Sequence, residues 1–183
     1  INNKIYDEKI FRSSLDYIES NTIVLDAGAN FGQMSILFSK SKENVEVYSF
    51  ESSKYIYNIL NKNILVNKAN VKAFNCILGN ESGKSYLIKK SQLNFHIPNY
   101  GSNKVEIANN KILNFSSEKV STMKIDDIKF DKKISFFKID VQGYDLNVLK
   151  GSKKTDLKVR TKKRIMLLLY SKISSTTCQS FII

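Results

Sequence analysis

The stretch IVLDAGANFGQMSILFS, residues 23–39, constrains the fold more than any other part of this chain. An apolar, β-branched run reaches Asp26, glycines follow at Gly28 and Gly32, and apolar residues then recur at helical spacing. An apolar run and a helical period joined by glycines are typical of a buried strand that turns directly into a helix. The stretch therefore predicts a strand–turn–helix unit like those that begin many nucleotide-binding sheets.

The rest of the chain alternates between strand and helix patterns. Apolar periodicity predicts helices at 7–20, 30–41, 53–67 and 144–151, a short helix or turn at 125–128, and strands at 22–28, 44–52, 70–78 and 133–140. Residues 79–123 differ, because a glycine-centred turn is followed by alternation, and they predict a β-rich insertion or antiparallel edge. Apolar runs at 164–172 and 178–183 predict a fifth parallel strand and the stub of a sixth. Alternating strands and helices imply an α/β fold with parallel pairing and right-handed crossovers.

Length and composition fit one domain. The chain has 183 residues, 42% hydrophobic and 25% charged, so we expect a single domain over residues 1–183. The longest apolar run, IMLLLY, is far shorter than the roughly 20 residues that a membrane span needs. Cys76 and Cys178 lie in unlike contexts without metal-ligand spacing. We therefore expect a reduced, cytoplasmic protein without a metal site.

The net charge of +12 suggests nucleic acid as a partner, but its distribution does not favour that interpretation. Residues 150–172 alone carry +8, which leaves +4 for residues 1–149. Only three of the 29 basic residues are arginines, the residue that bidentate contacts with phosphates and bases favour. A solvated surface with a basic tail is the preferred interpretation, and nucleic-acid binding or methylation is the alternative.

Asp26 discriminates between ligands of the predicted turn. Backbone N–H groups at the start of a helix bind the pyrophosphate of dinucleotides, and an acid in the position of the first fingerprint glycine would repel that group. An acid favours a ligand with a positive group, and S-adenosylmethionine has an α-amino group and a sulfonium but no phosphate. Gly28 would allow close approach of the ligand, and Gly32 close packing of helix on strand. A purely structural, capping Asp26 is the alternative.

A second acid, Glu51, ends the second predicted strand, 19 residues after Gly32. A carboxylate in this position can accept hydrogen bonds from both ribose hydroxyls of an adenosine. A solvated glutamate at a strand end is the alternative, so the prediction depends on Asp26 and Glu51 occurring together.

Five segments in order resemble the FkbM family of class I S-adenosylmethionine-dependent methyltransferases: VLDAGANFGQMSILFS, YSFES, FNCILGNESG, STMKIDDI and FFKIDVQGYDLNVLKGS. They span residues 22–152, and the last is the most specific. The resemblance implies a Rossmann-like sheet with helices on both faces, and O-methylation of a hydroxyl on a sugar, glycan or small natural product. The basic tail, residues 153–183, departs from the family pattern. An inactive, truncated cofactor-binding remnant is therefore a further alternative.

The resemblance also implies roles for residues of the cofactor site. The turn on the methionine side contains Asp26, Gly28, Asn30 and Gly32, the ribose side contains Glu51 and Ser52, and the adenine slot is lined by Asn75, Cys76 and Ile77.

Lys138 and Asp140 are the candidate catalytic residues. They end the fourth parallel strand and, two residues apart, point to the same side. Asp140 is expected to orient the acceptor hydroxyl or share its proton, and Lys138 to pair with it and lower its pKa. A structural ion pair that supports the Gln142–Gly143 turn is the alternative; many family members have Glu where Gln142 stands. The single histidine, His96, is expected at the surface, with a general-base role as the alternative. Asp126 and Asp127 are expected to cap or solvate the short helix rather than bind a cation.

Overall fold

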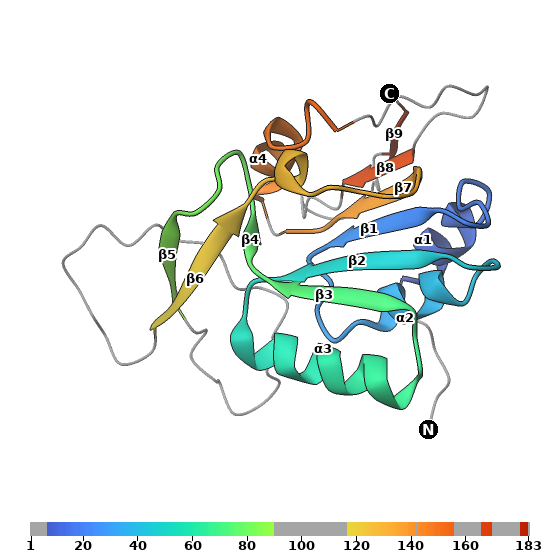
Figure 1. Cartoon of the computed structure of the whole chain (residues 1–183), viewed down its shortest axis with the longest axis horizontal. Coiled ribbons are helices and arrows are strands. Elements are labelled where there is room, and N and C mark those ends of the chain that lie inside the picture. The colour runs from blue at the N-terminus through green and yellow to red at the C-terminus, as the bar shows by residue number, and fades with distance from the viewer. Residues whose placement is uncertain (1–6, 90–116, 142, 156–165, 170–179, 183) are drawn as a thin grey trace.

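A six-stranded sheet of strand order β3-β2-β1-β7-β8-β9 forms the centre of the computed structural model (Figure 1). The structure describes residues 7–89, 117–141, 143–155, 166–169 and 180–182. The strands of this large sheet are β1 (Ile23–Ala27), β2 (Glu46–Glu51), β3 (Val71–Asn75), β7 (Ile134–Ile139), β8 (Met166–Leu169) and β9 (Ser180–Ile182). All neighbours pair in parallel except β8 and β9, which are antiparallel. The mostly parallel sheet and the fifth parallel strand are thereby confirmed.

Helices cover both faces of the large sheet, as expected. They are α1 (Glu8–Ser14), α2 (Gln33–Ser39), α3 (Lys54–Val66), the 3-10 turn η1 (Ile125–Asp127) and α4 (Asp145–Lys150). Side chains of α1 and α2 form a buried cluster with Val24 and Phe136. Ile125 of η1 and Val148 of α4 belong to a different cluster, on the opposite face. No helix in the described part of the chain is long and apolar enough to cross a membrane.

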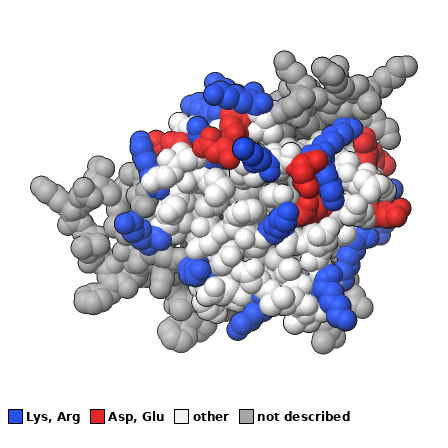
Figure 2. Space-filling model, in the orientation of Figure 1, with Lys and Arg blue, Asp and Glu red and all other residues white. Residues whose placement is uncertain are grey.

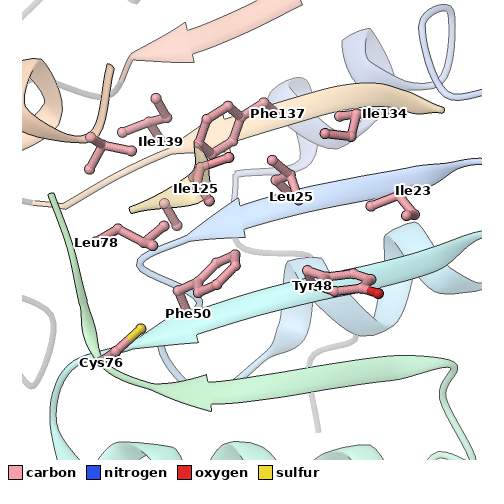
Figure 3. Close-up of a cluster of buried hydrophobic side chains, with 12 residues drawn as sticks. Ile23, Leu25, Tyr48, Phe50, Cys76, Leu78, Ile125, Ile134, Phe137 and Ile139 are labelled. Atoms are coloured by element: carbon pink, nitrogen blue, oxygen red, sulfur yellow. The ribbon is translucent and has the colours of Figure 1, made fainter. Parts of the chain in front are cut away.

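Strand alternation decides which side chains lie on each face. In β7 every residue is buried, as the sequence predicted for a central strand. Phe137 and Ile139 point with Leu25 and Phe50 into the cluster shown in Figure 3. The residues between them in β1 and β7 point the other way, toward α1 and α2. Asp26 and Lys138 therefore lie on the face that these two helices cover.

Two predicted boundaries are wrong. The helix predicted at 7–20 ends at Ser14, whose hydroxyl donates a hydrogen bond to the Phe11 carbonyl, 2.6 Å away, where the chain turns. The strand predicted at 70–78 is divided at Cys76. The side-chain amide of Asn75 donates to the carbonyls of Glu51 and Ser52, and the chain then leaves the large sheet. Ile77–Leu78 forms a separate strand, β4.

A small sheet of strand order β4-β6-β5 lies beyond the carboxyl ends of β1 and β2 (Figure 1). Its other strands are β5 (Ser85–Lys89) and β6 (Ser117–Met123), which pair antiparallel and confirm the β-rich insertion. Residues 90–116, with His96, lie outside the described residues.

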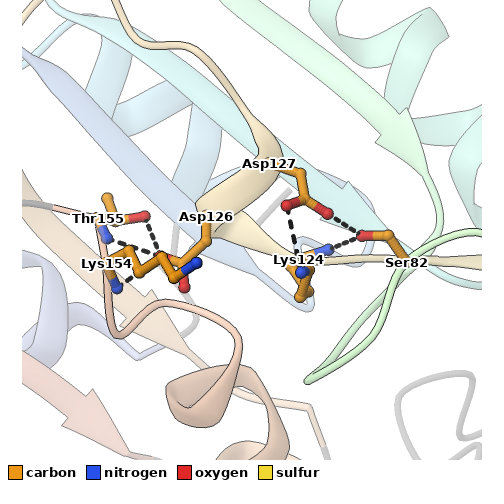
Figure 4. Close-up of polar contacts among 6 residues, drawn as sticks. All are labelled: Ser82, Lys124, Asp126, Asp127, Lys154 and Thr155. Carbon is orange, nitrogen blue, oxygen red and sulfur yellow. Dashed lines mark hydrogen bonds and ion pairs between the residues drawn. The ribbon is translucent and has the colours of Figure 1, made fainter.

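The η1 turn joins the base of the small sheet to the segment after α4 (Figure 4). Asp127 accepts a hydrogen bond from Ser82 Oγ at 2.6 Å and pairs with Lys124. Asp126 accepts hydrogen bonds from the backbone N–H groups of Lys154 and Thr155 and from the Thr155 hydroxyl. Both acids thus hold protein groups together.

Candidate functional site

The direction of chain progression reverses between β1 and β7. From β1 the chain adds β2 and β3 on one side, and it later returns to place β7 on the other side. Ligands of open α/β sheets bind at such a switch point, beyond the carboxyl ends of the strands. The predicted site residues lie at this edge, because the turn after β1, Glu51, Asn75 and Asp140 are located at or directly after the ends of β1, β2, β3 and β7.

The turn after β1 has a left-handed backbone at three of its residues. Gly28, Asn30 and Gly32 have φ values of 76°, 52° and 85°. A Cβ on Gly28 would overlap the main-chain carbonyl oxygen of Asp140, so the close approach at Gly28 joins the ends of β1 and β7. A Cβ on Gly32 would overlap Leu60, so Gly32 permits close packing against α3 rather than against a strand.

Asp26 and Lys138 form a buried ion pair across β1 and β7. They are direct partners in the strand register, and Lys138 Nζ lies 2.8 Å from Asp26 Oδ1. Ser35 Oγ donates to Asp26 Oδ2 at 2.6 Å, and Lys138 Nζ also donates to the Gly28 carbonyl at 3.3 Å. Asp26 has no exposed surface and Lys138 has 6%. The pair therefore supports the turn from inside the protein, and direct contact between Asp26 and a ligand stays a prediction.

Asp140 has a different environment from the one that the sequence predicted. Lys138 donates to Asp26, and it acts on Asp140 through its nearby charge. Burial raises the pKa of Asp140, and the opposing charge of Lys138 does not cancel this effect. The charge of Lys138 does lower the pKa of Asp140, as expected, but burial has the larger effect, and this desolvation is not visible in the sequence. A carboxylate with a raised pKa is the stronger base.

Asp7 is an acidic residue near the charge of Lys138 that sequence reasoning missed. It directly precedes α1, and Ile10 of α1 packs in the cluster with Val24 and Phe136. Val24 and Phe136 each precede a residue of the ion pair by two positions, so they lie on the same face of the sheet as Asp26 and Lys138. Burial raises the pKa of Asp7, and the charge of Lys138 opposes this shift. No pattern in the sequence indicates this proximity, because it depends on how α1 packs across the sheet.

Glu51 connects the ends of β1 and β2. Its Oε2 accepts a hydrogen bond from the Asn30 backbone N–H at 3.0 Å, and its Oε1 accepts one from the Ser53 N–H at 2.9 Å. Burial raises the pKa of Glu51 even though these hydrogen bonds favour the charged form. Asn75 donates to the Ser52 carbonyl at 2.8 Å, so the structure brings the predicted ribose-side residues together with the first residue of the predicted adenine slot.

The side chains of Cys76 and Ile77 point into the protein. Cys76 belongs to the cluster in Figure 3, and burial raises the pKa of its thiol to about 12. Ile77 packs with Val120 and Tyr144. Both side chains are 4% exposed, so their lining of an adenine slot stays a prediction.

Two buried side-chain oxygens in the described residues have no hydrogen-bond partner, Asn30 Oδ1 and Asp145 Oδ1. Asn30 belongs to the turn after β1, and Asp145 begins α4, shortly after β7, so they flank the switch point from its two sides. Buried polar atoms in folded proteins are normally paired, and an unpaired acceptor requires an explanation such as a ligand. The N–H and O–H groups of an amino acid or a ribose would satisfy both oxygens, so these residues fit S-adenosylmethionine.

A metal-ligating group of three or more His, Cys, Asp or Glu side chains is absent from the described ranges. Gln142, whose turn the alternative ion pair would support, lies outside the described residues.

Comparison with solved structures finds partial similarities to methyltransferases. Among them are a precorrin-6y C5,15-methyltransferase from Geobacter metallireducens (18% identity, 42% of each chain, TM-score 0.36) and a SAM-dependent methyltransferase from Geobacter sulfurreducens in complex with S-adenosyl-L-homocysteine (19% identity, 41% of this chain and 31% of that one, TM-score 0.34). A tRNA (uracil-54, C5)-methyltransferase from Pyrococcus abyssi is similar at 18% identity (40% of this chain and 20% of that one, TM-score 0.33).

Sequence comparison is more decisive. A curated relative, Methyltransferase sdnD from Sordaria araneosa, is 24% identical over 159 residues, which cover 73% of this chain and 61% of the relative. The chain thus spans about three fifths of the length of that relative. The family model of the methyltransferase FkbM domain matches residues 26–169, more than three quarters of the chain. The chain therefore belongs to the FkbM family of S-adenosylmethionine-dependent methyltransferases.

Proposed function

We propose that this chain is an O-methyltransferase that acts on a hydroxyl of a sugar, a glycan or a small natural product. The observation that carries the proposal is that the main chain of Asp140, whose carboxyl group has a raised pKa, lies against the turn that holds the partnerless oxygen of Asn30. We infer that a cofactor-binding turn and a candidate general base lie at one switch point. We include in the proposal a single domain over residues 1–183 and a reduced, cytoplasmic setting.

The cofactor would be held by the residues at the ends of β1, β2 and β3. Asn30 Oδ1 would accept a hydrogen bond from the amino-acid part, and the free lone pairs of Glu51 would accept hydrogen bonds from the ribose hydroxyls. Asn75 would keep the loop after β2 in place through its bonds to Glu51 and Ser52. When bound, S-adenosylmethionine supplies a methyl group activated by the sulfonium charge.

Asp140 would hold the acceptor hydroxyl and accept its proton as the acceptor oxygen is methylated. Its raised pKa favours this role. Because Gly28 has no side chain, the main chain of Asp140 can lie directly against the proposed cofactor turn. Lys138, predicted to be catalytic, has a supporting role in this proposal, because it is buried and bound to Asp26 and Gly28. Positioning of the acceptor would supply much of the acceleration.

The charge of the described residues on one face supports the preference for a small acceptor over nucleic acid. On the face shown in Figure 2, the described Lys and Arg side chains are spread among acidic and uncharged residues instead of forming one continuous patch. Proteins that bind nucleic acids usually gather their basic residues on one face or along one helix.

Two measurements test the proposal. S-adenosylhomocysteine should raise the melting temperature of the protein, and Glu51→Ala should abolish this increase; the absence of an increase in the wild type would refute cofactor binding. Transfer of a labelled methyl group should then be measured to sugars, glycosylated natural products, RNA and DNA. Label in the sugars or natural products supports the proposal, and label in RNA or DNA supports the alternative. Cofactor binding without label in any acceptor would favour an inactive remnant.

A further inference from the structure

Three of the five segments that resemble the FkbM family meet at Gly79, which belongs to the segment FNCILGNESG. Gly79 follows β4, and its N–H donates to the Met123 carbonyl at the end of β6, 3.0 Å away. A Cβ on Gly79 would lie 3.1 Å from Cε1 of Tyr144. A Cβ on Gly151 would overlap the carbonyl oxygen of Gly79. Tyr144 near the beginning and Gly151 at the end of the segment GYDLNVLKG therefore both pack closely against Gly79.

Tyr144 reaches from the site to the small sheet. It comes four residues after Asp140, and its N–H donates to the Val141 carbonyl at 3.3 Å, within the turn that follows β7. Its side chain packs against Ile77 of β4 and Val120 of β6. One side chain thus connects the turn after Asp140 with two strands of the small sheet.

The ring of Tyr144, rather than its hydroxyl, makes the contacts that matter here. The contact partners are aliphatic side chains and Gly79, where an added Cβ would lie 3.1 Å from Cε1 of the ring and 3.7 Å from the hydroxyl oxygen. Phenylalanine would keep these contacts, and leucine would replace the ring that fills the space beside Gly79 with a shorter aliphatic side chain.

We propose that Tyr144 is a positioning residue that fixes the small sheet of β4, β6 and β5 against the turn carrying Asp140. The small sheet lies beyond the carboxyl ends of β1 and β2 (Figure 1), so we assign it to the acceptor side of the site and leave the cofactor side to β1, β2 and β3. The assignment of an acceptor side rests on the proposed function; the fixing of the small sheet rests on the contacts alone.

Hydrogen–deuterium exchange of the full chain, together with calorimetric binding of S-adenosylhomocysteine, tests the proposal. Tyr144→Leu should speed exchange in β4 and β6 by about tenfold or more, while exchange in β1 and β2 and the affinity for S-adenosylhomocysteine stay within about twofold. Tyr144→Phe should behave like the wild type, because it restores the ring. Tyr55→Leu, the same change at a 56% exposed tyrosine of α3, is the matched control and should leave β6 unchanged.

The outcomes separate positioning from a general contribution to stability. If Tyr144→Leu speeds exchange across the whole large sheet and also lowers the affinity for S-adenosylhomocysteine, Tyr144 is only a stabilising residue and the proposal is wrong. Unchanged exchange in β6 would also overturn it. If the wild type does not bind S-adenosylhomocysteine, the proposed function fails, and the exchange data still decide whether Tyr144 fixes the small sheet.

Discussion

Asp26 and Lys138 face each other across β1 and β7, and the ion pair between them, 2.8 Å long, lies inside the protein. The two strands flank the switch point of the sheet, so the pair holds together the two sides of the candidate site. Burial alone would lower the pKa of Lys138, but the charges of Asp26, Asp140 and Asp7 outweigh burial and raise it. Lys138 is therefore charged in the folded protein and neutralises part of an otherwise acidic site.

Lys138→Met should strongly destabilise the protein, because it leaves the buried carboxylate of Asp26 without its cation. Loss of one partner of a buried pair costs about 3–5 kcal/mol, and we expect this decrease in the free energy of unfolding from urea denaturation. The double variant Asp26→Asn, Lys138→Met should recover much of the loss. Lys133→Met, which removes an exposed pair with Glu19, is the control and should cost less than about 1 kcal/mol. Equal losses in the two lysine variants would contradict a buried ion pair.

Glu51→Gln should lower the affinity for S-adenosylhomocysteine by about 10- to 100-fold, because a charged acceptor of hydrogen bonds is replaced by a neutral amide. Since burial raises the pKa of Glu51 above its ordinary value of 4.5, ligand binding by the wild type should weaken as the pH falls through this raised pKa. Glu51→Gln should lack this pH dependence in calorimetric titrations. A wild-type affinity that is independent of pH in the acidic range would speak against Glu51 as a ligand.

The stability of the ligand-free protein should depend on Glu51 in the opposite sense. The folded state holds the proton of Glu51 more tightly than the unfolded chain does, so the contribution of this residue is most favourable at low pH. It decreases as the pH rises from 4.5 through the raised pKa. The difference in free energy of unfolding between the wild type and Glu51→Gln, measured by urea denaturation across this range, should show this trend; a difference that grows in favour of the wild type with rising pH would contradict it.

Asp140→Asn should reduce the preference of the protein for S-adenosylmethionine over S-adenosylhomocysteine. The two ligands differ by a methyl group and a positive charge on sulfur, and the negative charge of Asp140 beside the cofactor turn favours the charged one. We expect the ratio of the two affinities to fall by about three- to tenfold, an electrostatic effect typical of a partly exposed carboxylate. Asp16→Asn, at an exposed position after α1, is the matched control for calorimetry. An equal effect of Asp140→Asn on both ligands would place Asp140 away from the sulfur.

The sequence predicted the main strands and helices, and which candidate residues end β1, β2, β3 and β7, because these follow from local patterns. The turn at Gly28 and Gly32 and the buried strand before Asp140 required only periodicity and glycines. The partner of Lys138 could not be predicted, because it depends on the register between β1 and β7, which are more than 100 residues apart in the chain. The raised pKa of Asp140 and the proximity of Asp7 to Lys138 depend on how the chain packs, which only the folded structure shows.

Gly28→Ala tests whether the close approach of the two strand ends matters, and Gly83→Ala provides its control. Both glycines have positive φ, 76° and 77°, so alanine carries a similar backbone strain of about 1–2 kcal/mol at each position. They differ in their surroundings, because a Cβ on Gly28 would overlap the Asp140 carbonyl, whereas nothing lies within 4 Å of a Cβ on Gly83. Gly28→Ala should therefore lower the free energy of unfolding clearly more than Gly83→Ala does. It should also lower the affinity for S-adenosylhomocysteine, because the added methyl group pushes the turn away from Asp140. Equal losses would show that backbone strain alone explains the glycine, and that the contact between the ends of β1 and β7 can relax freely.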